Sequence, residues 1–108
     1  MDVVKRGDVW LIALDPTRGR EIRKTRPCLV VSPDELNLTL PVASVVPLTS
    51  GSRAAAFRVP VTFAGRTGLL LPEQLRSVDR SRLVKRLGTI DPAALGSALA
   101  TLRAFFAE

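Results

Sequence analysis

Apolar residues along this chain come in short runs separated by polar, turn-forming segments. The runs are shorter than helices usually are and rich in strand-forming residues, so they predict strands. The first, over 8–14, is apolar from its second residue on, which indicates a strand buried on both faces. Further strands are predicted over 27–32, 41–48, 57–63, 69–71 and 74–78, with a last strand ending near Ile90.

Turn-forming residues punctuate these runs. Asp15-Pro16-Thr17 ends the first strand, and the polar segment 18–26 that follows is expected to be a loop. Residues 33–37 have the composition of a turn or a single helical turn. Residues 49–52 predict a turn, and 64–68 a hairpin loop. Asp79 is placed to cap a brief helical turn over 79–82.

The tail changes to a helical period. Asp91 followed by Pro92 is a helix start with an N-cap acceptor, because the missing N–H of proline costs nothing there. Leu95, Leu99, Leu102 and Phe106 then fall on one stripe. With 108 residues, the pattern predicts a single domain over 1–108, mainly β, in which a strongly bent barrel carries a C-terminal helix over an opening or seam.

Charge narrows the class of partner. Lys and Arg number 16 against 10 Asp and Glu, which gives a net charge of +6, and thirteen of the basic residues are arginine. Arginine forks onto phosphate with two parallel hydrogen bonds, so this excess is typical of a phosphate-binding surface. A merely solvated surface or an arginine-rich genome would produce the same composition.

Missing residue types exclude several kinds of site. The chain has no histidine and one cysteine, which rules out zinc sites, Ser-His-Asp triads, Cys-His dyads and two-histidine ribonuclease chemistry. Cys28 lies in an apolar run and is interpreted as an inert core residue. No paired carboxylate motif for metal is seen, so a metal-free route without cofactor is favoured. No run is long enough to cross a membrane and the first residues lack a signal peptide, so the cytoplasm is expected.

A basic, histidine-free protein can still cleave RNA. The 2′-hydroxyl of RNA attacks the neighbouring phosphorus, so the enzyme has only to align the attack, stabilise the added charge and help protons move. A guanidinium beside a hydroxyl can stabilise the added charge. Arg26 stands at the start of one predicted strand and Thr49 at the end of another, where the rim of a barrel could join them. The residues alone do not distinguish them from Arg23 or Ser50.

Four stretches, in order, resemble the MazF/PemK family of bacterial endoribonuclease toxins over nearly the whole chain. They are Lys5-Arg6-Gly7-Asp8-Val9-Trp10 with Asp15-Pro16 after it, the segment 24–33, which contains Arg26-Pro27, Pro47-Leu48-Thr49-Ser50, and the segment 68–79 with its Gln and Arg. The resemblance implies an SH3-like barrel and a homodimer. It also implies a sequence-specific, metal-independent toxin that cleaves single-stranded messenger RNA to a cyclic phosphate and a 5′-hydroxyl.

The resemblance also implies roles for single residues. Arg26 takes the position of the catalytic arginine that stabilises the phosphorane, and Thr49 that of the catalytic threonine. Glu21 takes a position where a carboxylate could orient or deprotonate the 2′-hydroxyl, or could only pair with neighbouring arginines. Here Ile22-Arg23-Lys24 follows in place of the family's glutamine and glycines, so the family's cleavage preference is not carried over.

Contacts to RNA are expected from residues around these positions: Arg20, Arg23, Lys24, Ser50, Arg53, Arg58, Gln74 and Arg76. The basic residues Lys24, Arg53 and Arg58 are expected to touch phosphates, which sets affinity rather than sequence choice. Trp10 could stack on a base, but its apolar neighbours favour core or dimer interface.

Two other functions remain open at this point. The same barrel serves CcdB-like toxins that bind DNA gyrase without catalysis, and a non-catalytic RNA-binding module would share the basic groove. The resemblance to the MazF/PemK family also implies a partner, a small, acidic, partly disordered antitoxin that folds across the basic groove and hides it.

Overall fold

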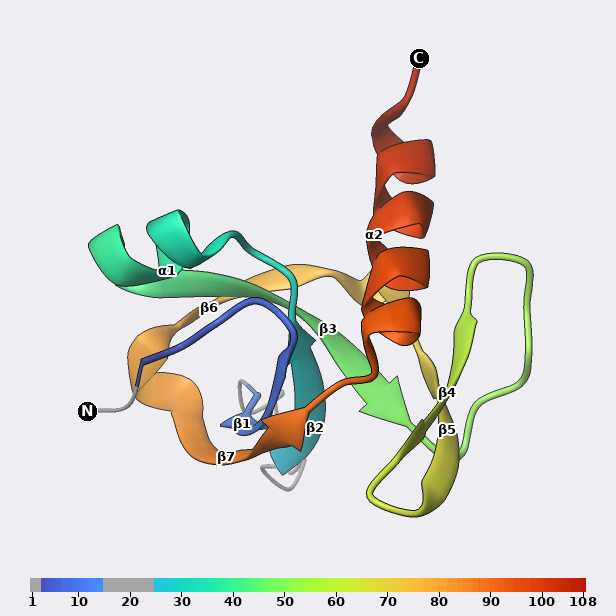
Figure 1. The fold of residues 1–108 in the computed structure, drawn as a ribbon, viewed down its shortest axis with the longest axis horizontal. Coiled ribbons are helices and arrows are strands. Elements are labelled where there is room, and N and C mark those ends of the chain that lie inside the picture. Colours follow the sequence, from blue (N-terminus) through green and yellow to red (C-terminus); the bar gives the residue numbers. More distant parts are fainter. Residues whose placement is uncertain (1–2, 15–24) are drawn as a thin grey trace, which may run out of the picture.

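The computed structural model describes residues 3–14 and 25–108. Seven strands in these ranges form one antiparallel sheet in the order β4-β5-β3-β2-β1-β7, and β6 also pairs with β3 (Figure 1). The elements are β1 (Asp8–Ala13), β2 (Thr25–Val30), α1 (Asp34–Thr39), β3 (Val42–Thr49), β4 (Val59–Phe63), β5 (Arg66–Leu70), η1 (Pro72–Gln74), β6 (Arg76–Asp79), η2 (Arg80–Arg82), β7 (Leu83–Thr89) and α2 (Pro92–Phe106).

Strand β3 makes the sheet curl. Its first half pairs with β6, and its last two residues, Leu48 and Thr49, pair with β5. Strands β4 and β7 are the two ends of the strand order, and the Phe63 ring of β4 packs on the bare backbone of Gly88 in β7. The result is a half-barrel with a C-terminal helix, which confirms the predicted fold class.

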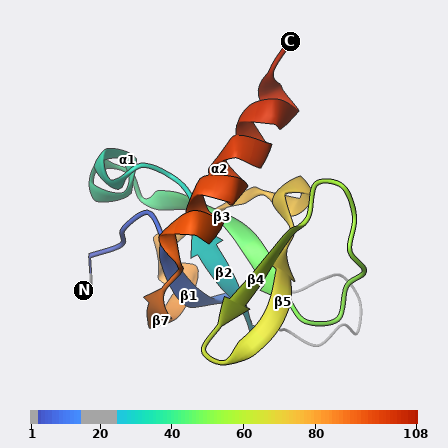
Figure 2. The same ribbon diagram turned by 45° about the vertical axis from the view of Figure 1, so that its right-hand side comes forward.

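Two cores form on opposite faces of the central strands. Successive side chains of a strand point to opposite faces, so Leu29 faces one core while Cys28 and Val30 face the other. Helix α2 packs against β4 and η1 and covers the first core (Figure 2). Trp10 is 5% exposed within the second core. The predictions that β1 is buried on both faces and that Cys28 and Trp10 belong to the core are therefore confirmed.

The predicted stripe on the tail helix is right for its three leucines and wrong for its last residue. Leu95, Leu99 and Leu102 pack toward the first core, but Phe106 is 72% exposed. The buried face of α2 is centred on Ala94, Ala98 and Leu102. With about 3.6 residues per turn, each step of four residues drifts a little further around the helix, so a step of three from Leu102 returns closer to the centre of that face than another step of four. Phe105 therefore packs inward, 5.0 Å from the ring of Phe57.

Three further local expectations need correction. The hairpin loop predicted over 64–68 is a two-residue turn, Ala64 and Gly65, both at positive φ as a type I′ turn requires, and β5 already begins at Arg66. The strand predicted from Gln74 begins instead at Arg76, because Pro72 starts the 3₁₀ turn η1 that includes Gln74. Asp79 does cap η2, accepting from Ser81 N at 2.9 Å, whereas Asp91 holds the N-cap position of α2 without a side-chain cap bond.

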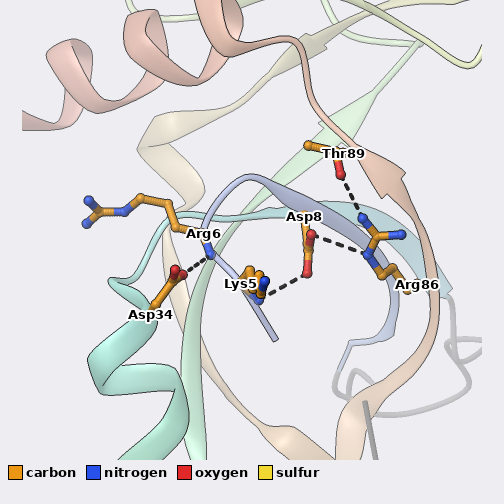
Figure 3. A network of polar contacts seen from close by, with 6 residues as sticks. All are labelled: Lys5, Arg6, Asp8, Asp34, Arg86 and Thr89. Carbon is orange, nitrogen blue, oxygen red and sulfur yellow. Dashed lines mark hydrogen bonds and ion pairs between the residues drawn. The ribbon is translucent and has the colours of Figure 1, made fainter. Parts of the chain in front are cut away.

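The N-terminal turn is held by Asp8, whose side chain is 6% exposed. Its carboxylate accepts from Lys5 N at 3.0 Å and forms an ion pair with Arg86 Nε at 3.3 Å. Arg86 in turn donates to Thr89 Oγ1 at 2.7 Å (Figure 3). This network ties the N-terminal turn and β1 to β7, the outer strand of the sheet.

Gly7 and Arg6 complete that anchor. Gly7 has a φ of 95°, a conformation that other L residues avoid. Its N–H donates to Val30 O at 2.8 Å and its carbonyl accepts from Ile90 N at 2.8 Å. Arg6 N donates to Asp34 Oδ1 at 2.7 Å, which fixes the start of α1 to the same turn.

Replacing Asp8 by Ala should lower the free energy of unfolding by about 1–3 kcal/mol, because Lys5 N and the Arg86 guanidinium lose their shared acceptor. The control Glu35→Ala, on the exposed side of α1, should change it by less than about 0.5 kcal/mol. Urea unfolding of both variants measures the difference, and equal midpoints would contradict a structural role for Asp8.

Candidate active site

The pairing of β2 with β3 brings Arg26 and Thr49 together. Cys28 lies opposite Pro47 and Leu29 opposite Val46. Continuing this register to the ends of the strands sets Arg26 directly opposite Thr49. Directly opposite residues of an antiparallel pair point to the same face, with Cα atoms about 4.5–5.5 Å apart. Two residues far apart in sequence therefore share one spot at the end of the central strands.

Arg26 and Thr49 both line the same two cavities. A cavity of about 600 Å³ lies between the strand ends and the β4–β5 hairpin. A smaller cavity of about 170 Å³ lies next to η1. The larger is also lined by Thr25, Pro27, Leu48, Ser50, Phe63, Ala64, Arg66, Thr67, Gly68 and Leu87. The smaller is also lined by Leu14, Pro47, Ser52, Leu71 and Gln74.

The two side chains offer complementary groups. Thr49 Oγ1 accepts from Gly51 N at 3.2 Å, which orients the hydroxyl and leaves its proton to be donated. Within the described ranges, no hydrogen bond or ion pair occupies the half-buried Arg26 guanidinium. A half-buried cation beside an oriented hydroxyl is an arrangement that can bind a phosphate and stabilise charge developing on it.

Gly68 allows the β4–β5 hairpin to approach Thr49. A Cβ atom at Gly68 would lie 2.7 Å from the carbonyl oxygen of Thr49 and 3.4 Å from Leu48 Cδ1. Real Cβ atoms do not approach a backbone oxygen so closely, so only glycine permits this contact. The hairpin thereby becomes one wall of the larger cavity.

The other predicted site residues fall into four groups. Gln74 lines the smaller cavity and Ser50 the larger one. Arg76 lies opposite Val45, near enough to Cys28 that its charge partly opposes the rise in the pKa of that thiol that burial causes. Arg58 forms an ion pair with Glu73 at 2.9 Å and donates to Arg53 O at 2.8 Å, and neither arginine lines these cavities. Arg20, Glu21, Arg23 and Lys24 lie outside the described residues.

Several cavity residues escaped the sequence analysis. Phe63, Arg66 and Leu87 line the larger cavity, and Leu14, Ser52 and Leu71 the smaller one. The sequence did contain a signal for Arg66, since a basic residue directly after Gly65 lies at the tip of a predicted hairpin, where it can contact a ligand. It contained no signal for Leu87, because only the curl of the sheet brings β7 to the cavity.

The remaining chemistry of the described residues is limited. No helix among them has the length and apolar character that crossing a membrane requires. Likewise, no three Asp, Glu, Cys or His side chains gather in the described ranges where a metal ion could be held. Burial raises the pKa of the Cys28 thiol to about 12, against the opposing charges of Arg76 and Arg26.

Residues 5–106 match the family described as the PemK-like, MazF-like toxin of type II toxin–antitoxin systems. The chain belongs to this family. It is 37% identical over 105 residues to endoribonuclease PemK of Escherichia coli, covering 92% of this chain and 79% of PemK. It is 36% identical over 104 residues to endoribonuclease MazF9 of Mycobacterium tuberculosis, covering 86% of this chain and 87% of MazF9.

Solved structures of family members share the fold. MazF from Deinococcus radiodurans superposes with a TM-score of 0.83 at 27% identity, over 97% of both chains. A chain of the MazE–MazF crystal structure (form II) from the same organism superposes with a TM-score of 0.86 at 27% identity, over 97% of this chain and 96% of that one. The family resemblance seen in the sequence is therefore confirmed.

Substituting Gly68 by Ala should destabilise this PemK/MazF family member by about 1–3 kcal/mol, because the new methyl group meets the Thr49 carbonyl. Gly96→Ala is the matched control: nothing lies within 4 Å of that position on α2, and alanine favours the helix by about 0.5–1 kcal/mol. Thermal unfolding should move in opposite directions for the two variants, and an unchanged midpoint for Gly68→Ala would contradict the close approach.

Cys28 should resist thiol reagents at pH 8 in the folded protein, because it is fully buried and its pKa lies at about 12. After unfolding in urea, the same thiol should react fully. Iodoacetamide labelling followed by mass spectrometry measures both states, and rapid labelling of the folded chain would show that the thiol is accessible.

Proposed function

We propose that this chain is a sequence-specific, metal-independent endoribonuclease toxin that cleaves single-stranded RNA, messenger RNA in particular. The observation that carries the proposal is that Arg26 and Thr49, at neighbouring ends of β2 and β3, line the same two cavities. Family membership and the endoribonucleases PemK and MazF9 among its relatives support it. Because messenger RNA is the proposed substrate, we propose that the protein acts in the cytoplasm.

The reaction uses the nucleophile that RNA supplies. The 2′-hydroxyl attacks the adjacent phosphorus, the bond from phosphorus to the 5′-oxygen breaks, and the products are a 2′,3′-cyclic phosphate and a free 5′-hydroxyl. Arg26 stabilises the added negative charge on the pentavalent phosphorus and donates toward the leaving 5′-oxygen. Thr49 donates its hydroxyl proton to a phosphate oxygen and holds the phosphate in line.

Proton removal from the 2′-hydroxyl needs a base. Glu21 is the proposed carboxylate that orients or deprotonates it, and that residue lies outside the described ranges. Gln74 and Arg76 extend the site along the RNA, since Gln74 shares a cavity with the pair and Arg76 neighbours Cys28 on the same face. Arg53, Arg58 and Lys24 serve as phosphate contacts, with RNA competing against Glu73 for Arg58.

A dimer and an antitoxin are the proposed partners. Phe57, Val84 and Phe106 are 50%, 58% and 72% exposed, which favours a second copy of the chain as cover for apolar surface. The structural neighbours include MazE–MazF crystal structures. A net charge of +6 fits an acidic, partly disordered antitoxin segment that folds over the Arg26–Thr49 site and excludes RNA.

Arg26→Ala and Thr49→Val should each slow RNA cleavage by about 100-fold or more, because each removes a group that stabilises the transition state. Thr49→Ser should restore most of the activity, since it keeps the hydroxyl, and Arg103→Ala on the exposed side of α2 is the matched charge control. The measurement is cleavage of a long mixed-sequence RNA in EDTA, with the ends of the fragments mapped.

Discrete cuts with cyclic-phosphate and 5′-hydroxyl ends, lost in the two variants and kept in the control, support the proposal. Intact RNA with folded wild-type protein would contradict it and favour a gyrase-binding toxin. RNA binding that survives Thr49→Val without any cleavage by the wild type would identify a non-catalytic RNA-binding module.

A further inference from the structure

The larger cavity is wider than Arg26 and Thr49 need in order to bind one phosphate. Its lining includes four apolar side chains, Pro27, Leu48, Phe63 and Leu87, and it has a volume of about 600 Å³. The smaller cavity, at about 170 Å³, already gives Arg26 and Thr49 a polar neighbourhood next to Gln74. A second, wider space with apolar walls therefore directly adjoins the proposed site of chemistry. Flat aromatic rings stack well against such walls.

Arg66 stands at the rim of this cavity with its guanidinium available. It lies directly opposite Phe63 across the β4–β5 hairpin, so both side chains share the face that lines the cavity. Among the described residues, none forms a hydrogen bond or an ion pair with the Arg66 side chain. The Phe63 ring itself is held by contact with Gly88 at the seam of the half-barrel.

We propose that the larger cavity is a subsite for one unstacked RNA base beside the scissile phosphate, and that Arg66 reads that base. The inference rests on the proposed ribonuclease function and adds the residue that sets part of its sequence preference. Phe63, Leu48 and Leu87 hold the base by apolar contact, while Arg26 and Thr49 hold the phosphate next to it.

The chemistry of arginine indicates which bases fit. A guanidinium carries five N–H donors in a rigid fork and no acceptor. It therefore pairs best with two adjacent acceptors, as on the O6 and N7 edge of guanine or the O2 and N3 edge of cytosine. Adenine and uracil place an N–H donor beside their acceptors and leave one arm of the fork unpaired. The subsite should therefore prefer guanine or cytosine.

The test is a comparison of cut sites in a random-sequence RNA library for wild type, Arg66→Gln and Arg66→Lys. Wild type should show a preference for guanine or cytosine at one position next to the cut. Arg66→Gln should move that preference toward adenine, which a glutamine amide pairs with at N6 and N7. Arg66→Lys keeps the charge but loses the fork, so selectivity at that position should fall at least about tenfold.

Arg103→Gln is the matched control, since it removes the same charge from the exposed side of α2 and should leave the cut sites unchanged. If Arg66→Gln weakens cleavage equally at all sequences, Arg66 contacts phosphate and the proposed subsite is wrong. Cut sites identical to those of wild type would also overturn it while leaving the ribonuclease intact. Intact RNA with the wild-type chain would overturn both.

Discussion

The antiparallel pairing of β2 with β3 is the constraint on which the rest of this structure depends. These strands lie inside the sheet, and their alternating side chains supply both cores, Leu29 and Val46 to one face and Cys28, Val30 and Val45 to the other. A slip of one residue in this register would turn every one of those side chains to the wrong face. The same register, continued to the strand ends, brings Arg26 and Thr49 to one place, where both line the same cavities. The energy that holds the fold therefore also holds the geometry of the candidate active site.

The candidate active site has two parts: the ends of β2 and β3, which the cores hold rigidly, and the β4–β5 hairpin, which forms one wall of the larger cavity. Arg26 and Thr49 lie at the ends of strands that run through both cores, whereas the β4–β5 hairpin pairs with β3 only at its edge, through Leu69 and Leu70. Gly68 makes that approach possible, and the Phe63 ring against Gly88 supports the hairpin from the other side. Strands fixed by cores suit residues that stabilise a transition state, and a hairpin that can vary in sequence suits residues that select a substrate. The proposed roles of Arg26, Thr49 and Arg66 follow this division.

Much of the fold was predictable from the sequence because local rules determine it. Short apolar runs predicted the strands. Asp79 was correctly predicted to cap the helical turn that follows it, and Pro92 to start α2. Phe106 was misplaced because the buried face of α2 is centred on Ala94, Ala98 and Leu102, which brings Phe105 rather than Phe106 to the core. Arg26 and Thr49 came from family resemblance, since no local signal separates them from Arg23 or Ser50. The larger cavity could not be predicted from the sequence, because the curl of the sheet brings together the start of β2, the β4–β5 hairpin and Leu87, which lie far apart in the chain.

The central claim is that Arg26 and Thr49 act on one phosphate as a unit, and a double-mutant cycle tests it most directly. Rate constants for cleavage of one defined RNA are measured for wild type, Arg26→Ala, Thr49→Val and the double variant. Residues that act together give strongly non-additive effects. The double variant should therefore be about as slow as the slower single variant. Losses that multiply independently would contradict the shared site and would separate the two residues in function.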